Sequence, residues 1–168
     1  MKKQIIKTTR EIDETINLIA ENIMTDYPHG LIDLISLNDA PKFFTLDLAK
    51  NLNKEIRFQK LEFENYKTRT GSGEVKIIQD LEHPIYGRHI ILTDGIIISG
   101  ITHDYLCNLL KQRSPASIAI ASIASKPSLL KKKLPRCYTL FNFTDEMIEG
   151  YGMGSSKLKE KKSLFDVR

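Results

Sequence analysis

The stretch that most constrains the fold of this chain is HIILTDGIIISGIT, from His89 to Thr102. Its first part is the kind of apolar run that forms a buried strand, and small polar residues then precede a helical pattern of apolar residues. In an α/β protein, a loop between a strand and a helix presents backbone N–H groups and a helix N-terminus to an anion. The stretch therefore predicts an α/β fold with a phosphate-binding site after this strand.

The composition is that of one compact domain. The chain has 168 residues, 41% of them hydrophobic and 27% charged, which is enough apolar side chain for a substantial core. The formal net charge of +4 comes without the stripe of aromatic and basic residues that marks nucleic-acid-binding surfaces. We therefore expect a single domain over residues 1–168 that binds small anions and no nucleic acid.

Two features predict a cytoplasmic location. Cys107 and Cys137 lack the spacing of a metal site and fall in predicted elements, where they would be buried thiols of a reducing compartment. The N-terminal residues carry no apolar signal segment, and no apolar run approaches the roughly 18 residues that span a bilayer. We expect no contact with membranes.

Periodicity predicts strands that alternate with helices. Three helices are expected: one capped by Thr8 or Thr9, one with Pro41 in its first turn, and one from about Thr102 to Gln112. Strands are expected over residues 31–37, 56–63, 74–78, 117–123 and 137–143, and from His89 onward. This alternation favours a mainly parallel sheet with right-handed crossovers.

Three further expectations concern packing and loops. The second helix should turn its apolar residues inward, namely Phe43, Phe44, Leu46, Leu48 and Leu52. The polar segment from Asn65 to Gly73 should be a mobile loop inside a hairpin. Residues from Gly150 onward, with several glycines and a cluster of lysines, should be loop-like.

Three motifs occur in a fixed order. They are Leu37-Asn38-Asp39-Ala40, then Tyr66 followed by Gly73-Glu74-Val75-Lys76-Ile77, then the stretch from His89 to Thr102. In this order and spacing the chain resembles the hypoxanthine-guanine phosphoribosyltransferase family, whose members join a 6-oxopurine to phosphoribosyl pyrophosphate and release pyrophosphate. The resemblance implies a type I phosphoribosyltransferase-like fold: a mainly parallel twisted sheet flanked by helices, with a flexible hairpin loop and a small hood.

The resemblance implies that Ser99, Gly100, Ile101 and Thr102 hold a 5′-phosphate. Their chemistry suits that role, because two hydroxyls, a glycine that permits close backbone approach and the N–H groups of a helix start all favour a phosphate. The same residues could instead be an ordinary helix cap.

Asp94 falls on the first of the family's two adjacent acids, which bind the ribose hydroxyls and help to hold magnesium. A carboxylate suits sugar hydroxyls or a hard cation, although a solvated loop aspartate is the alternative. Gly95 stands in place of the second acid, so we expect weaker ribose and metal binding.

The resemblance places Ile98 where the family has an aspartate that assists as a general base at purine N7. An aliphatic side chain has no titratable group, and general acid–base help is typically worth about 10²–10⁴-fold. We therefore assign no catalytic residue and expect slowed, not abolished, turnover.

On the purine side, Lys126 falls on the family's lysine that donates to the purine exocyclic oxygen. An ammonium group selects an oxygen acceptor over an amino group. Met147 stands where an aromatic residue stacks on the base, and Ile148 would offer its backbone groups. Lys126 could equally be a solvated lysine, and Met147 and Ile148 could be core residues.

On the pyrophosphate side, the resemblance assigns Leu37, Asn38 and Asp39 to the pyrophosphate loop, with Asp39 repulsive unless a cation bridges it. Tyr66 and Lys67 fall on the flexible loop. Gly154 replaces an aspartate that takes part in magnesium binding. Lys157, Lys159, Lys161 and Lys162 either serve for a missing arginine or form a solvated tail.

The function expected from the sequence is that of a purine phosphoribosyltransferase acting on hypoxanthine or guanine, with phosphoribosyl pyrophosphate as co-substrate and Mg²⁺ as cofactor. An alternative is a catalytically degenerate member that binds purine nucleotide as a sensor or regulator, and a third is a structural subunit without a ligand. Apolar faces such as Phe43-Phe44 would suit the homodimers or homotetramers usual in this family.

Overall fold

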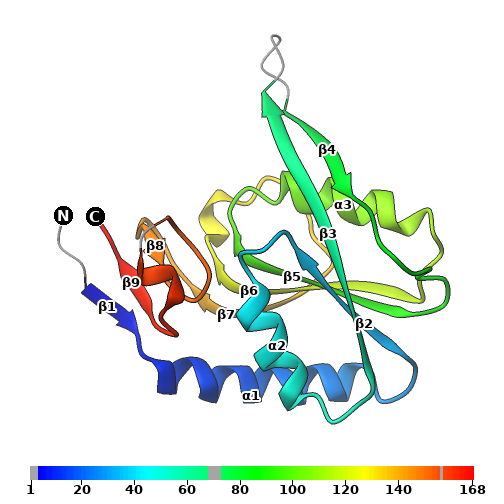
Figure 1. The fold of residues 1–168 in the computed structure, drawn as a ribbon, viewed down its shortest axis with the longest axis horizontal. Helices are drawn as coiled ribbons and strands as arrows, with labels where there is room; N and C mark the ends of the chain where they lie inside the picture. The colour runs from blue at the N-terminus through cyan, green and yellow to red at the C-terminus, as the bar shows by residue number, and fades with distance from the viewer. Residues whose placement is uncertain (1–3, 68–72, 156) are drawn as a thin grey trace.

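A mostly parallel sheet forms the centre of the computed structural model, which describes residues 4–67, 73–155 and 157–168 (Figure 1). Its strand order is β4-β3-β2-β5-β6-β7. The strands are β2 (Ile32–Leu37), β3 (Ile56–Lys67), β4 (Gly73–Gln79), β5 (His89–Ile97), β6 (Ser117–Ser125) and β7 (Arg136–Asn142). Neighbours pair in parallel except β3 and β4, which form an antiparallel hairpin. The predicted mainly parallel α/β fold is confirmed.

Helices cover both faces of the sheet. α1 (Thr9–Asp26) and α2 (Lys42–Asn51) pack on one face and α3 (Ile101–Lys111) on the other (Figure 1). α1 begins as predicted, because the Thr8 hydroxyl accepts from the Glu11 N–H while the Glu11 carboxylate accepts from the Thr8 N–H. The carboxyl ends of the parallel strands therefore lie at one edge of the sheet, between the two helical layers.

The inward face predicted for α2 is only partly correct. Phe44 and Leu48 are fully buried and Leu52 is 4% exposed, but Phe43 and Leu46 are 48% and 43% exposed. At about 100° per residue, Phe44 and Leu48 share one side of the helix, whereas Phe43 and Leu46 project away from it. The helix therefore keeps an apolar outer surface.

The predicted hairpin is present, but its strands are longer than expected. Asn65, Tyr66 and Lys67, which we predicted in the mobile loop, belong to β3, where Tyr66 pairs with Glu74 and Lys67 with Gly73. The two strands extend beyond the rest of the sheet (Figure 1), so polar residues can occupy both faces and the strand pattern is lost from the sequence. The rest of the predicted loop, residues 68–72, lies outside the described residues.

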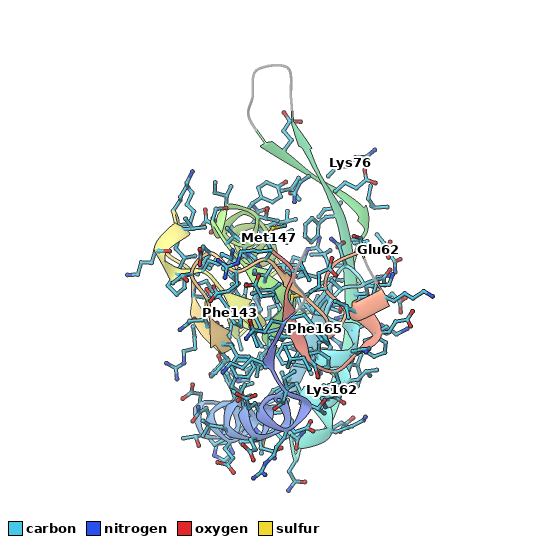
Figure 2. The ribbon with its side chains drawn as sticks, turned by 90° about the vertical axis from the view of Figure 1, so that its left-hand side faces the viewer. Glu62, Lys76, Phe143, Met147, Lys162 and Phe165 are labelled. Atoms are coloured by element: carbon cyan, nitrogen blue, oxygen red, sulfur yellow. The ribbon has the colours of Figure 1, made fainter. Side chains whose placement is uncertain are left out.

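The two ends of the chain meet in a second sheet. We call this sheet, together with the described residues from Met147 onward that flank and connect its strands, the hood. The sheet consists of β1 (Gln4–Lys7), β9 (Leu164–Asp166) and β8 (Ile148–Glu149), in the order β1-β9-β8. Leu164 and Phe165 are buried, and Lys162 pairs with Asp13 of α1 at 2.5 Å, close above that helix in Figure 2. The loop-like C-terminus predicted from the sequence is therefore wrong, since this segment contains β9 and the short helix η2 (Lys157–Glu160).

The two cysteines differ in environment. Cys107 lies in the buried face of α3, and burial raises the pKa of its thiol to about 11. Cys137 is exposed at the start of the edge strand β7, so its predicted burial is wrong. Across the described residues, no helix is long and apolar enough to cross a membrane.

Candidate active site

A tight turn joins β5 to α3 at the carboxyl edge of the sheet. β5 ends at Ile97, and α3 begins at Ile101, one residue earlier than predicted. Gly100 has a φ of 74°, a left-handed conformation that glycine adopts without strain. No side chain caps the helix at Gly100, and the nearest hydroxyl, that of Ser99, accepts a long 3.4 Å bond from the Ile101 N–H. This helix start therefore offers N–H groups and hydroxyls to an anion.

A cavity of about 340 Å³ lies at this turn. We call its surroundings the phosphoribosyl half of the site. It is lined by Asn38, Phe63, Asn65, Asp94, Ile96, Ile98, Ser99, Gly100, Thr102 and His103. The structure thus brings together six of the predicted residues: Asn38, Asp94, Ile98, Ser99, Gly100 and Thr102. Three others, Leu37, Asp39 and Ile101, do not line this cavity; Leu37 is a core residue at 1% exposure.

Asp94 lies near the end of β5 and pairs with a histidine that the sequence analysis missed. The Nε2 atom of His103, in the first turn of α3, lies 2.8 Å from Asp94 Oδ2, while Asp94 Oδ1 accepts from the Gly95 N–H at 2.6 Å. The side chain of His103 is 7% exposed and that of Asp94 is 22% exposed. The sequence did carry a signal: His103 is the one polar residue on a face of α3 that otherwise consists of Leu106, Cys107 and Leu110.

The place of the second acid is filled by another side chain. A Cβ atom added to Gly95 would lie 2.9 Å from Cγ of Met153, which is 5% exposed in the hood. Gly95 thus faces the hood while Asp94 faces α3, as neighbouring residues of a strand do. Gly154, the other departure on the metal side, has a φ of 89°, and a Cβ there would lie 2.5 Å from Cγ of Glu149.

The donor set does not fit a magnesium ion held by protein side chains. Mg²⁺ requires hard oxygen ligands in near-octahedral geometry. Within the described ranges, no group of three or more His, Cys, Asp or Glu side chains is placed to hold a metal ion. Both Asp94 oxygens already accept protein hydrogen bonds.

The loop after β2 is fixed by the side chain of Asn38. This residue has a φ of 59°, its Oδ1 accepts from the Phe63 N–H at 2.9 Å, and its own N–H donates to the Leu61 carbonyl at 3.0 Å. Asp39 pairs with Lys60 at 2.8 Å, and that lysine holds the pKa of the Asp39 carboxyl below its usual range. The expected repulsion between Asp39 and pyrophosphate is therefore offset by a cation already in place.

Lys60 and Lys42 were not singled out from the sequence. Both line a second cavity of about 430 Å³, which also contains Asn38 and Asp39. Asn38 is common to this cavity and the phosphoribosyl half, so the two hollows meet at the loop after β2.

The β3–β4 hairpin reaches the phosphate turn. The Thr102 hydroxyl donates to Asn65 Oδ1 at 3.3 Å. The backbone of Tyr66 and Lys67 continues β3 past this contact, and their side chains lie outside the part of the chain that the structure describes.

The residues expected to bind the purine gather beside the phosphate turn, and we call Lys126, Met147 and Ile148 the purine half. The Lys126 N–H donates to the Ile97 carbonyl at 2.9 Å, and Lys126 Nζ donates to the Glu146 carbonyl at 2.8 Å. Met147 is 59% exposed and lies in the hood, where Figure 2 labels it. It is not a core residue.

Ile148 is placed to use its backbone. It is paired with Asp166, and the bond from the Val167 N–H to the Met147 carbonyl flanks that pair. In an antiparallel ladder such a pair is the non-hydrogen-bonded kind, so the N–H and C=O of Ile148 point away from β9.

Ile98 is 44% exposed and lines the phosphoribosyl half. Among the described residues, the titratable side chains that line this cavity are Asp94 and His103. The aliphatic side chain of Ile98 therefore lines the cavity at the position where the family has an aspartate.

The C-terminal segment is held in the hood by backbone carbonyls of two lysines and by the side chain of a third. The Lys159 and Lys161 carbonyls accept from the N–H groups of Gly152 and Tyr151, and Lys162 pairs with Asp47 at 2.7 Å. The Tyr151 hydroxyl donates to Asp47 at 2.6 Å, and burial with this carboxylate raises the pKa of the phenol. The side chains of Lys157, Lys159 and Lys161 are exposed, in line with the solvated reading, whereas the Lys162 side chain is held by its ion pair.

A glycine turn, a helix N-terminus and a carboxylate at the carboxyl edge of a parallel sheet define a class of phosphate-binding α/β protein. The profile of the "Phosphoribosyl transferase domain" family matches residues 6–155. The chain therefore belongs to this family.

The individual relatives agree with the predicted resemblance. The chain is 28% identical to the hypoxanthine-guanine phosphoribosyltransferase of Bacillus subtilis over 90% of this chain and 84% of the relative. A crystal structure of a Bacillus anthracis hypoxanthine-guanine phosphoribosyltransferase has a TM-score of 0.92 at 23% identity, covering 98% of both chains. A ternary substrate complex of the Trypanosoma cruzi hypoxanthine phosphoribosyltransferase has a TM-score of 0.90 at 26% identity, covering 98% of this chain and 94% of that one. The resemblance and the type I fold predicted from the sequence are confirmed.

Proposed function

We propose that this chain is a purine phosphoribosyltransferase that transfers phosphoribosyl from phosphoribosyl pyrophosphate to hypoxanthine or guanine in purine salvage. The observation that carries the proposal is the phosphoribosyl half, where Asn38 of the loop after β2 lines a single cavity with Asp94 of β5, Ser99 of the turn and Thr102 of α3. The names of the relatives support the same activity.

The phosphoribosyl group is held in two places. The turn at Ser99 and Gly100 and the start of α3 bind the 5′-phosphate through N–H groups and hydroxyls. Asp94 accepts hydrogen bonds from the ribose hydroxyls, using lone pairs that its two protein partners leave available. Its negative charge also favours the positive charge that develops on the ribose as pyrophosphate departs.

The purine lies between Lys126 and Met147. Lys126 Nζ exchanges the Glu146 carbonyl for the purine 6-oxygen, or donates to both, while the exposed Met147 thioether packs on the base and Ile148 binds its edge through the backbone. This arrangement favours hypoxanthine and guanine over adenine, whose 6-amino group would face a second donor.

In the reaction, the bond from the ribose to pyrophosphate breaks and a bond from the ribose to the purine nitrogen forms. The purine proton passes to water, because the side chain of Ile98 offers no base. The side chains position both substrates and stabilise charge, and we expect slower turnover than a relative with an acid at this position would give.

Magnesium enters the proposal only with the co-substrate. Because the described side chains do not fit a protein-held ion, any Mg²⁺ that the reaction requires is ligated by phosphoribosyl pyrophosphate and water. We also propose a single cytoplasmic domain that forms homodimers or homotetramers, with the exposed Phe43 and Leu46 of α2 as apolar surface for self-association.

The test is direct. Purified protein is incubated with hypoxanthine, phosphoribosyl pyrophosphate and Mg²⁺, and inosine monophosphate and pyrophosphate are measured together against a heat-denatured control. We expect both products in equal amounts. Calorimetric binding of inosine monophosphate without any turnover would instead indicate a nucleotide sensor, and neither binding nor turnover would contradict the proposal entirely.

A further inference from the structure

The pairing of His103 with Asp94 has no counterpart in the functions assigned above. His103 lines the phosphoribosyl half together with Asp94, and it is 5% exposed overall. An ionised carboxylate only accepts hydrogen bonds, so the Nε2 atom 2.8 Å from Asp94 Oδ2 carries the proton and donates it. The helix that starts the phosphate turn thus also holds the carboxylate of the neighbouring strand.

Stability alone does not account for a histidine at this position. The other buried residues on this face of α3 are Leu106, Cys107 and Leu110, and all belong to the same apolar cluster. A leucine or methionine would continue that face without having to desolvate a polar ring. What the imidazole adds, and an apolar side chain does not, is one donor aimed at Asp94.

We infer that His103 is a positioning residue, which fixes the Asp94 carboxylate in the orientation that accepts hydrogen bonds from the ribose hydroxyls of the ligand. This inference rests on the proposed function. With Oδ2 held by His103 and Oδ1 by the Gly95 N–H, the carboxylate cannot rotate, and each oxygen keeps a lone pair for the ligand. A protein donor thereby supplies the orientation that a metal ion would otherwise provide.

The arrangement also links the two parts of the phosphoribosyl half. His103 directly follows Thr102, whose hydroxyl lines the same cavity. An anion that orders the first turn of α3 therefore orders the donor that holds Asp94. The contributions of the 5′-phosphate and the ribose hydroxyls should be coupled through this one turn of helix.

The experiment compares inosine monophosphate with its 2′,3′-dideoxy analogue by calorimetry, with a chelator present so that no cation can orient Asp94. In His103→Met, we expect the affinity for inosine monophosphate to fall about 10-fold, the size of one lost hydrogen bond to a charged group, and that for the analogue to fall less than about 2-fold. A hydroxyl-specific loss is a result that general damage to the helix would not give.

Two amide variants keep the test valid if His103→Met folds poorly. The amide nitrogen of glutamine can reach the position of Nε2, whereas that of asparagine is too short, so His103→Gln should retain the hydroxyl preference and His103→Asn should lose it. Leu106→Met, a volume-conserving change on the same face of α3, is the control and should leave both affinities unchanged.

The possible outcomes distinguish failure of the positioning role of His103 from failure of the proposed function. Equal losses for both ligands in His103→Met and His103→Asn would overturn the positioning role and leave the proposed function standing. A wild-type protein that binds both ligands with equal affinity would show that Asp94 does not bind the ribose hydroxyls, and this result would also overturn the positioning role. A wild-type protein that binds neither ligand and shows no turnover would overturn the proposed function, and with it this inference.

Discussion

The two halves of the site are built from different materials. The phosphate turn of the phosphoribosyl half depends on backbone, namely a glycine with positive φ and the N–H groups of a helix start, whereas its ribose side depends on the Asp94 carboxylate. The purine half depends on the side chains of Lys126 and Met147, and the nearby side chain of Ile98 offers no polar atom. A phosphate site made of backbone N–H groups persists as sequences diverge, because most substitutions leave the backbone unchanged. A single substitution, in contrast, is enough to remove an acidic side chain.

This difference predicts which substitutions should remove activity and which should only change its rate or selectivity. Disturbing the backbone of the phosphoribosyl half should remove activity almost completely. Changes to side chains that face the purine should alter rate and selectivity by smaller factors, and an acid introduced at Ile98 should raise the rate.

The largest effect is expected for Gly100→Val. At a φ of 74° a β-branched residue is strained, and its Cβ would lie 3.3 Å from Leu130 and Leu134. Strain of about 3 kcal/mol that displaces the phosphate turn should lower the turnover of hypoxanthine about 100-fold. The measurement is the rate of inosine monophosphate formation.

Gly87 provides the matched control, because it has a φ of 67° with no atom within 4 Å of an added Cβ, and it precedes the opposite end of β5. Gly87→Val should lower the melting temperature in the same way but leave turnover unchanged. Equal losses of turnover in the two variants would show that the effect is one of stability, not of phosphate binding.

The next effect is expected for Lys126→Met. Removing the donor to the purine oxygen should lower kcat/KM for hypoxanthine about 30-fold, equivalent to about 2 kcal/mol for a hydrogen bond to a charged group. The preference for hypoxanthine over adenine should fall with it. Lys133→Met, at an exposed position in the same connection, is the control. An unchanged ratio between the two bases would remove Lys126 from the purine half.

A gain is expected for Ile98→Asp. The new carboxylate should raise turnover about 10-fold, below the roughly 10²–10⁴-fold typical of general acid–base help because the neighbouring residues have not been selected to orient it. Ile98→Asn, which accepts a hydrogen bond but does not titrate in this range, should give less, and only the aspartate variant should acquire a new acid limb in its pH profile. No gain in either variant would mean that Ile98 does not face the purine.

Local signals in the sequence were sufficient for much of this architecture. The cap of α1 at Thr8, the strand β5 and the turn before α3 each depend on neighbouring residues, and all were predicted within a residue or two. The small hood was implied by the family resemblance, but local signals did not place its strands. β1 and β9 have four and three residues and pair the two ends of the chain, so neither carries a periodic pattern long enough to detect.

The site shows the same division. Residues in contiguous motifs, such as Ser99 and Thr102, could be named from the sequence. His103 could not, because its role depends on a strand residue nine positions away and on a helix face that reads as apolar. Met153 was missed for a similar reason: only the folded hood brings it against Gly95.

The smallest effect on turnover is expected for Gly95→Asp, which restores the second acid of the family pattern. Because Met153 already occupies that space, the new side chain cannot reach the ribose, and turnover should stay within about 2-fold. Overpacking should instead destabilise the protein by about 1–3 kcal/mol, or roughly 2–4 °C in Tm for each kcal/mol, as thermal unfolding would show. Adding Met153→Ala should recover part of that loss by opening the space. If Gly95→Asp alone raised turnover, Gly95 would face the ligand, and the ribose side of the phosphoribosyl half would use a second carboxylate beside Asp94.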